Sequence, residues 1–493
     1  MRAYPCCLVQ ATINGLPSNE PKPTFMQALS LTGTPAAGPL GYHSWALFEW
    51  ARNPYVILVT IYIFAPYFTT TVAPNPVEGQ SLLGFNNTIS GLIIALTAPF
   101  LGAIADRRGR RKPWIVAFVS IMVPASYLLW WSMPFGGGIG IPATLALMVV
   151  VSIAFEYSAV FHNAMLPSVA PVAKVGVISG YALAYGNIAG LLLMVFVLYA
   201  FALPGTTEWS FIPDAPLFGL DQSTSEQDRI VAPLAAVWML LFTLPLMLFT
   251  PDGKDASGSV SAAVRDGLRS VWETVQRLRH YQNMALYLIS RMIFNDGMVG
   301  VLIFGGVYAA GTFGWDTTTM LILGIISSFS AAVGAIIGGW LDDALGSRKA
   351  VLIAIGGTAG LLAVGVNIQP HMILFMPYDN SEPVWASPYF STLPELLFFL
   401  NNQLFAMFIT VGFASSRTMM ARIAPPSMMT QFFGLYALSG TATAFLAPLL
   451  VGTFTRYFDS QRAGYSSLII LLTVGFCMMF FVREEQAVAH RDG

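Results

Sequence analysis

Two related loops, separated by about half the chain, constrain the fold more than any other feature of this sequence. The first runs from Gly102 to Lys112 and places five cations between two long apolar segments. The second runs from Gly339 to Lys349 and repeats both glycines, the aspartate and two cations at a constant offset of 237 residues (339 minus 102, for example). A loop of this kind, repeated between apolar segments, indicates a duplicated membrane protein with two pseudo-symmetric halves.

The composition agrees with a chain that lives in a lipid bilayer. Of the 493 residues, 55% are hydrophobic and only 10% are charged, whereas soluble domains carry about 25% charged residues. The net charge of −1 leaves no domain-sized basic face, so a nucleic-acid partner is excluded. The N-terminal forty residues contain no evident signal peptide, and Met26 could be the true start.

Apolar segments of about 20 residues, the length that crosses a bilayer, occur twelve times. The sequence therefore predicts an all-α integral membrane protein with twelve transmembrane helices in two pseudo-symmetric six-helix bundles. The expected helices lie near 46–68, 83–105, 113–134, 143–165, 177–203, 230–250, 284–311, 319–341, 350–368, 393–415, 432–455 and 465–482.

The same pattern divides the chain into five parts. We expect a cytoplasmic tail at 1–44, bundles at 45–250 and 284–482, a cytoplasmic linker at 251–283 and a tail at 483–493. Apolar residues between 264 and 278 recur on one helical face, which predicts an amphipathic linker helix on the membrane surface or an ordinary solvated one. Most of the 24 Lys and Arg residues fall on the side of the termini, so both termini are expected in the cytoplasm.

Polar side chains inside the expected helices are the candidates for a transport site, because charge in the hydrocarbon is costly. They concentrate in the first, fourth, seventh and tenth helices, the equivalent members of successive three-helix units. The substrate or coupling candidates are Glu49, Arg52, Glu156, His162, Asn163, Arg291, Asn295, Asp296 and Asn402.

Several of these residues also have simpler interpretations. Glu49 and Arg52 are three positions apart and could merely neutralise each other. Arg291 could extend to the membrane surface, and His162 could bond to a neighbouring helix. For Asp296, which lies beside Asn295 and Gly297, a functional role is favoured. Glu156 lies deeper in the expected helix, so we expect it to have a partner or to take up a proton reversibly.

The repeated loops suggest a gate. Their candidate residues are Gly102, Asp106, Arg107, Gly109, Arg110, Arg111, Gly339, Asp343, Gly346 and Arg348. Because a helix N-terminus carries partial positive charge, we hypothesise that Asp106, steadied by Arg110 and Arg111, latches onto the start of the eleventh helix near Phe432. The alternative is that the cations only set the topology.

No enzymatic site competes with this interpretation. The five histidines are scattered, and Cys6, Cys7 and Cys477 match no zinc spacing, so neither a metal nor a cofactor is expected. No pattern of a nucleophile elbow or a phosphate-binding loop is present.

The loop at 102–112 and its copy at 339–349 resemble the paired loop signature of the major facilitator superfamily. Finer features resemble its vacuole effluxer branch, the autophagy-related amino-acid effluxers of fungi and their bacterial relatives. They are Phe48-Glu49-Trp50-Ala51-Arg52-Asn53, Phe64-Ala65-Pro66-Tyr67-Phe68, Phe161 to Pro167, Phe294 to Gly297 and Phe432 to Gly440. Arg52, where the branch has a small polar or amide residue, and Ser347 depart from the pattern.

The resemblance implies a single-polypeptide secondary transporter with twelve helices that works by alternating access. Amino acids are the substrate class that it implies, and a cavity offering Glu49, Arg52, Arg291 and Asp296 could pair both ends of a zwitterion. We further expect proton coupling through Asp296 or Glu156, a monomer, and the cell (inner) membrane of a bacterium. A sugar or other small-metabolite proton symporter, or a non-transporting membrane sensor on the same fold, remains an alternative.

Overall fold

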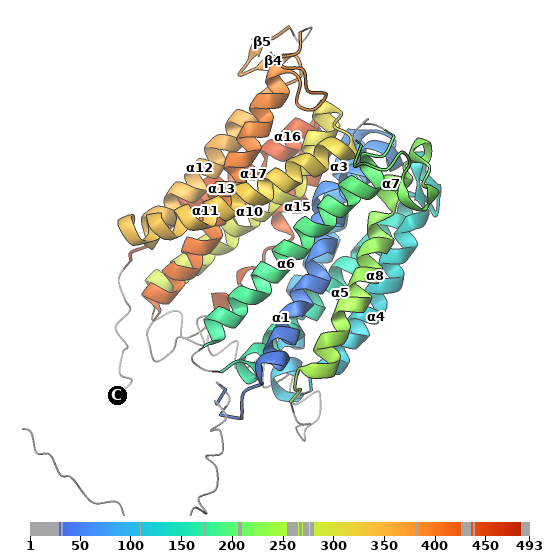
Figure 1. Cartoon of the computed structure of the whole chain (residues 1–493). Coiled ribbons are helices and arrows are strands. Elements are labelled where there is room, and N and C mark those ends of the chain that lie inside the picture. The colour runs from blue at the N-terminus through green and yellow to red at the C-terminus, as the bar shows by residue number, and fades with distance from the viewer. Residues whose placement is uncertain are drawn as a thin grey trace, which may run out of the picture.

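The computed structural model is an assembly of long, roughly parallel helices (Figure 1). Ten helices in the described part of the chain are long and apolar enough to cross a membrane. The described residues are 29–30, 33–108, 110–171, 174–205, 210–253, 265, 269, 276, 281–379, 382–424, 435–436 and 439–484, without the side chains at 98–99, 102–108 and 176.

The first span shows how local sequence determines a helix. It starts at Pro39, earlier than the expected residue 46, because a proline fits the first helical turn, where its missing N–H is not needed. Pro54 then removes one hydrogen bond inside the span, and the residues that follow continue as a π-helix. The span comprises α1 (Pro39–Pro54), η1 (Tyr55–Tyr62), α2 (Phe64–Tyr67) and η2 (Phe68–Val72).

Two sets of helices, one from each half of the sequence, follow in the order that the sequence predicts. The first half continues with α3 (Pro76–Arg108), α4 (Lys112–Leu128), α5 (Gly140–Val169), α6 (Val175–Val197) with η6 (Leu198–Ala202), α7 (Glu226–Arg229) and α8 (Val231–Phe249). The second half contains α10 (Gln282–Phe313), α11 (Thr317–Leu345), α12 (Ser347–Gly365), α13 (Leu393–Ile423), α15 (Leu446–Phe458), α16 (Gln461–Ser466) and α17 (Leu468–Phe480). Most of the linker helix expected between the halves lies outside the described residues.

The two ends of the molecule differ. The end at which α1 begins and α17 ends, called the terminal side below, carries the repeated loops (Figure 1). The opposite end, called the distal side, carries two short antiparallel sheets. They consist of β1 (Ser132–Met133) with β2 (Gly137–Gly138), and of β3 (Ile368–Gln369), β4 (Met372–Ile373) and β5 (Met376–Pro377).

On the distal side the two halves are closed against each other. Gly84 of α3 and Gly452 of α15 meet so closely that a Cβ atom on Gly84 would lie 2.6 Å from the Cα atom of Gly452. Gln80 donates to the hydroxyl of Thr455 at 2.7 Å, and Ser81 donates to the carbonyl of Gly452 at 3.2 Å. Small residues at this crossing let the two helix backbones touch.

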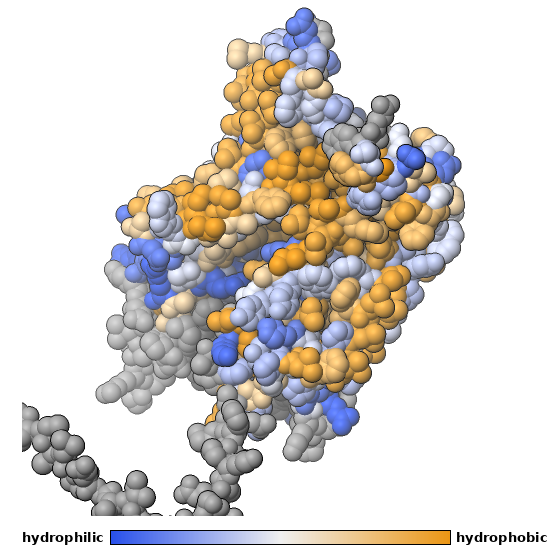
Figure 2. Space-filling view, viewed as in Figure 1, coloured by the Kyte–Doolittle hydropathy of each residue, from blue (hydrophilic) through white to orange (hydrophobic). Residues whose placement is uncertain are grey.

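Toward the terminal side the halves separate. Figure 2 shows polar surface set back in a hollow between the two halves, below the closed distal end. Among the described residues, the hydrogen bonds between the two halves lie on the distal side, including those from Thr317 and Thr318 to the first half. The described contacts thus close the molecule at its distal end, and the polar hollow in Figure 2 lies on the terminal side of this closure.

The eleventh span differs from the expected continuous helix at 432–455. In its described part, residues 440–445 form turns and α15 starts only at Leu446. The break follows from the sequence Gly-Thr-Ala-Thr at 440–443, which contains a glycine and two β-branched residues that form helix poorly. It is held in place by Thr443, whose hydroxyl donates to the Met292 carbonyl of α10 at 2.9 Å.

The outer surface of the helices is apolar. Large hydrophobic side chains, among them Leu248, Ile336 and Trp340, are 70%, 76% and 81% exposed. A soluble protein rarely displays so much contiguous apolar surface. The hydrophobic face visible in Figure 2 is thus the surface that contacts lipid in a multi-pass integral membrane protein.

Candidate functional site

Four of the candidate residues come together in the first half. Glu49 and Arg52 lie one helical turn apart on α1, with 3.6 Å between Oε2 and Nε. His162 of α5 faces the other carboxylate oxygen, with 3.5 Å between its Nδ1 and Oε1 of Glu49. Glu156, one to two turns earlier on α5, interacts electrostatically with both Arg52 and Glu49. We call Glu49, Arg52, Glu156 and His162 the ionic cluster.

The α1–α5 contact fixes the ring of His162. Its Nε2 lies 2.9 Å from the carbonyl of Trp45, and the indole N–H of Trp45 donates to the carbonyl of His162 at the same distance. The two rings also stack, with centroids 4.5 Å apart. His162 is fully buried, so this reciprocal pair sets both its position and its orientation.

The orientation of His162 has a consequence for protons. A carbonyl can only accept, so Nε2 must carry the hydrogen that faces Trp45. In neutral histidine Nδ1 would then have no hydrogen, and it would face an ionised Glu49 carboxylate that has none either. Nδ1 of His162 and Oε1 of Glu49 are thus placed so that a hydrogen on either atom would point toward the other.

Arg52 supplies the positive charge of the ionic cluster. Its guanidinium lies over the ring of Phe155, 4.0 Å from the centroid, and the residue is only 9% exposed. Its Nε and Nη1 atoms are buried and make no hydrogen bond within the described residues. Nε faces the carboxylate of Glu49, so Nη1 is the donor that an acidic group of a ligand could use.

Arg291 and Asp296 of α10 are placed differently, because both bind the interrupted eleventh span. Arg291 donates to the carbonyl of Tyr436 at 2.8 Å and to the hydroxyl of Ser439 at 2.5 Å, and it lies 3.5 Å from the centroid of the Tyr436 ring. Asp296 accepts the backbone N–H of Ala447 at 2.8 Å. Asp296 thus satisfies one of the free N–H groups at the start of α15.

This arrangement predicts different effects for two substitutions of Asp296. Asn keeps an acceptor oxygen for the Ala447 N–H, whereas Ala removes it and leaves a buried donor unpaired. We expect Asp296→Ala to destabilise the protein by about 1–2 kcal/mol more than Asp296→Asn does. Thermal unfolding of the two purified variants measures the difference, and equal stabilities would contradict the capping role.

The remaining candidates are scattered. Asn295 is buried on α10, and Asn163 is exposed on α5. Asn402 of α13 lines a small cavity between η1 of the first half and the helices of the second half, together with Ser327 of α11 and Tyr62. The structure thus groups the charged residues of the first half but not the amides.

The gating residues of the first loop lie for the most part outside the description. The backbone of α3 is described to Arg108, but the side chains of Gly102, Asp106, Arg107 and Arg108 are not, and neither is Gly109. Phe432, the expected partner of Asp106, is also outside the described residues. The latch between Asp106 and the eleventh helix stays a prediction.

At the second loop the described contacts involve Asp342 in place of the expected Asp343. Asp342 is buried and pairs with Arg422 of α13 at 3.0 Å, whereas Asp343 is exposed. Arg422 also pairs with Glu484 at 2.8 Å. Glu484 in turn accepts the backbone N–H groups of Ser347 and Arg348 at 3.0 and 3.1 Å, the first residues of α12.

The first half contains a counterpart of Glu484. Asp252, just after α8, accepts the backbone N–H groups of Arg111 and Lys112 at 2.9 and 3.1 Å. In each half, an acid that follows the sixth helix therefore caps the N-terminus of the third, where negative charge is favoured. We call the Asp252 and Glu484 contacts the carboxylate caps; the sequence analysis did not select either residue.

Glu484 gives a prediction that depends on pH. Partial burial raises the pKa of Glu484, but the Arg348 N–H, Arg422 and the Ser347 N–H together hold it below its usual value of 4.5. A lowered pKa means that the stabilisation is present above the usual value and is lost as the pH falls below it. We expect Glu484→Gln to lower the unfolding temperature by a few degrees at pH 7 and to have little effect near pH 3, as a thermal melt in each buffer will measure.

The chain is similar to known membrane proteins. Residues 69–491 match the family described as vacuole effluxer Atg22 like. An uncharacterised MFS-type transporter YxiO of Bacillus subtilis (strain 168) is 25% identical over 455 residues, which cover 90% of this chain and 95% of that protein. Autophagy-related protein 22 of Cryptococcus neoformans (strain JEC21) is 22% identical over 279 residues, which cover 55% of this chain and 47% of that protein.

The fold has solved counterparts as well. A crystal structure of a D-xylose-proton symporter superposes with a TM-score of 0.62 at 13% identity, covering 91% of this chain and 99% of that one. At this identity the likeness shows the fold alone. The family match and the similarity to the MFS-type transporter of Bacillus subtilis show that the protein is a membrane transporter of the major facilitator type and not an enzyme, and the fold agrees with that class.

Within that class the position of the chain is clear, because the family match covers most of its length. The chain belongs to the Atg22-like vacuole effluxer family.

Proposed function

We propose that the protein is a secondary active transporter of amino acids that works by alternating access and is coupled to protons. The ionic cluster carries this proposal. It combines Arg52, whose buried Nη1 donor is unfilled, with two glutamates and a histidine, all on helices α1 and α5 of a transporter fold. Such a site offers a cation for a carboxylate and acids for an ammonium group.

The polar hollow on the terminal side supports the alternating-access part of the proposal. A carrier must expose its site on one side of the membrane at a time, and here the described contacts between the halves extend from the distal side to the middle of the molecule. We further propose that the terminal side is cytoplasmic, that the membrane is the inner membrane of a bacterium, and that one chain suffices for transport.

The contact between Glu49 and His162 supports the coupling part of the proposal. A site in which a carboxylate and an imidazole share one proton releases or takes up that proton when a charged substrate changes its surroundings. Coupling through Asp296 or Glu156 remains part of the proposal, although Asp296 is engaged in capping α15.

Counterflow in proteoliposomes tests the substrate class. Vesicles preloaded with a mixture of unlabelled amino acids should accumulate a labelled member of that mixture, and vesicles preloaded with xylose should not accumulate labelled xylose. An imposed proton gradient should accelerate amino-acid uptake, and Glu49→Gln together with His162→Gln should remove that acceleration. Uptake that ignores the proton gradient in the unsubstituted protein would contradict coupling while leaving the substrate assignment intact.

A sugar or similar small metabolite is the second candidate. Ser327, Asn402 and Tyr62 contribute neutral polar groups of the kind that bind hydroxyls to an otherwise mainly apolar cavity. Its volume is about 30 Å³, so a sugar would bind there only in a state in which the halves have moved apart. Counterflow with xylose in place of amino acids would select this alternative, and no counterflow with any solute would favour a sensor.

A further inference from the structure

A second cavity lies between the two halves on the distal side, away from the ionic cluster. Its volume is about 340 Å³, enough for a small organic molecule. The first half contributes Tyr62, Tyr67 and Asp228 to its wall, and the second half contributes Trp315, Asp316 and Thr317. We call this space the distal cavity.

Two carboxylates give the distal cavity strong acceptors, beside amide and hydroxyl groups that can donate or accept. Asp228 is only 7% exposed, and it accepts hydrogen bonds from the hydroxyl of Thr317 and, at 3.1 Å, from the amide of Gln227. The Gln227 amide nitrogen donates to Asp228. The amide oxygen of Gln227 is buried and has no hydrogen-bond partner in the described part of the chain. Asp316 adds a second carboxylate, and the lining residues that the structure describes include no Lys or Arg. Such a wall suits a ligand with several donors and a positive charge.

Aromatic residues complete the distal cavity. Tyr62, Tyr67 and Trp315 line it beside the two carboxylates. Tyr67 and Trp315 are fixed by hydrogen bonds outside the cavity, to the carbonyl of Ser132 at 2.8 Å and to Glu395 at 2.9 Å. Aromatic faces attract ammonium groups, with tryptophan the strongest, so they favour the same kind of ligand as the carboxylates do.

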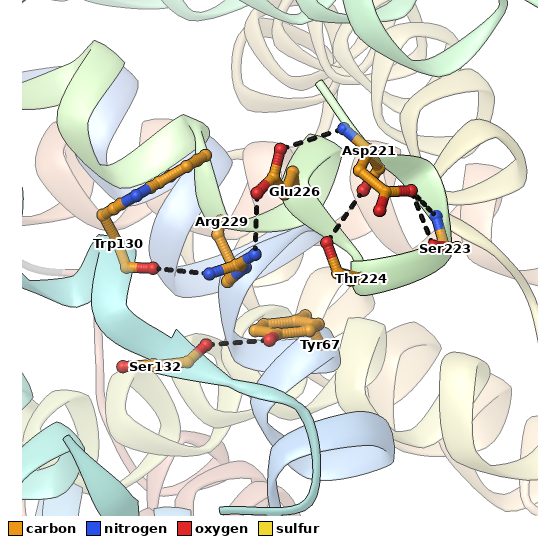
Figure 3. Close-up of polar contacts among 8 residues, drawn as sticks. All are labelled: Tyr67, Trp130, Ser132, Asp221, Ser223, Thr224, Glu226 and Arg229. Carbon is orange, nitrogen blue, oxygen red and sulfur yellow. Dashed lines mark hydrogen bonds and ion pairs between the residues drawn. The ribbon is translucent and has the colours of Figure 1, made fainter. Parts of the chain in front are cut away.

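The wall on the first half is held rigid before any ligand arrives. Figure 3 shows Arg229 between the Glu226 carboxylate and the carbonyl of Trp130, at 3.3 and 3.1 Å, and Glu226 accepting the backbone N–H of Asp221 at 2.9 Å. Hydrogen bonds from Ser223 hold the pKa of Asp221 below its usual value, so this turn stays charged and ordered. Asp228, one residue before Arg229, is thereby presented in a fixed place. A preorganised site loses less free energy on binding than a mobile one.

We propose that the distal cavity binds a small primary-ammonium cation, and that a bound cation keeps the distal side closed. The second part follows from the first. Since the wall comes from both halves, the site is complete only while they are together, so a ligand there stabilises the distal-closed state by its own binding free energy. This site does not depend on which solute the ionic cluster transports.

Ethanolammonium chloride is the probe, and the full chain in lipid nanodiscs is the sample. Isothermal titration measures binding, and electron–electron distance measurements report the closed population. The spin labels replace Phe218 and Tyr457, two highly exposed residues in distal segments of the two halves, after the three cysteines have been changed to serine. We expect saturable binding, a shift toward the short distance, and weaker binding of tetramethylammonium, which has no N–H donors.

Two substitutions locate the ligand. Asp316→Asn retains the N-cap acceptor for Thr319 but removes the charge, so the fold is preserved while affinity falls about tenfold. Trp315→Leu should weaken binding by a similar factor. Asp214→Asn, which removes an exposed carboxylate from the same distal region without lining the cavity, is the matched control, and Glu49→Gln should bind as the unsubstituted protein does.

The outcomes separate clearly. Affinity lost in Asp316→Asn and Trp315→Leu but kept in the two controls supports the site. Affinity lost in Glu49→Gln alone would place the ligand at the ionic cluster and overturn the inference, as would equal binding by all variants or no saturable binding. None of these results decides whether amino acids are transported, which rests on the counterflow experiment.

Discussion

Gly84→Val will hold the distal side open and suppress transport. A Cβ atom at this position lies 2.6 Å from the Cα atom and 2.7 Å from the amide nitrogen of Gly452, so the halves cannot close without displacing a backbone. Overpacking of this kind costs about 1–3 kcal/mol, and the cost arises only in the closed state. The closed population should therefore fall roughly 5- to 150-fold.

The distance between labels at Phe218 and Tyr457 measures that population, and proteoliposome flux measures the functional loss. Gly360→Val is the matched control, because no atom lies within 4 Å of a Cβ atom placed there on α12. An unchanged distance distribution in Gly84→Val would show that the contact between α3 and α15 does not control closure.

Arg52→Met is expected to have the second large effect. Met fills a similar volume, but Glu49 and Glu156 lose the cation beside them. A fully buried uncompensated charge costs about 3–5 kcal/mol; Glu49 and Glu156 are only partly buried, so we expect a smaller cost and a lower unfolding temperature. Transport should fall roughly 100-fold, because one fixed charge in a low-dielectric site contributes several kcal/mol to binding.

A double substitution separates stability from function. Glu49→Gln combined with Arg52→Met removes one acid together with its cation and should restore much of the stability, but not the flux. Arg417→Met is the control for loss of an arginine, because Arg417 is exposed on α13. If Arg52→Met retains full transport, the ionic cluster is not the substrate site.

The architecture could be predicted from sequence because it depends on patterns that the bilayer enforces. In a bilayer, an apolar segment of spanning length is stable as a helix because its backbone hydrogen bonds are then all satisfied. The distribution of cations sets the orientation of these helices, and the repeated loop relates the two halves. The expected continuous eleventh helix is the exception. Its residues at 440–445 are apolar or neutral, so hydropathy does not reveal that the helix stops there; Gly440 and the two threonines were the available signal.

The candidate site could be predicted only in part. Charge inside the membrane selected Glu49, Arg52, Glu156 and His162, and helical spacing is enough to place each pair on one helix. Sequence alone could not show that Asp296 and Arg291 bind the eleventh span, because those contacts join segments about 150 residues apart. It also favoured Asp343 over its neighbour Asp342, since the repeat offset says nothing about which side chain faces Arg422.

The carboxylate caps were missed for another reason. The cost of charge in the hydrocarbon marks only residues inside the helices, whereas Asp252 and Glu484 lie just beyond the last helix of each half. A comparison of the two halves would have found an acid in the same place after each sixth helix. Their partners are backbone N–H groups, which leave no trace in the sequence.

The carboxylate caps also fix distances within each half. Asp252 ties the chain after α8 to the first turn of α4, and Glu484 ties the chain after α17 to the first turn of α12. Rocking of the molecule should therefore leave separations inside either half unchanged while separations across the molecule vary. A label pair on α4 and α8 provides a built-in constant against which each gating movement can be calibrated in the same sample.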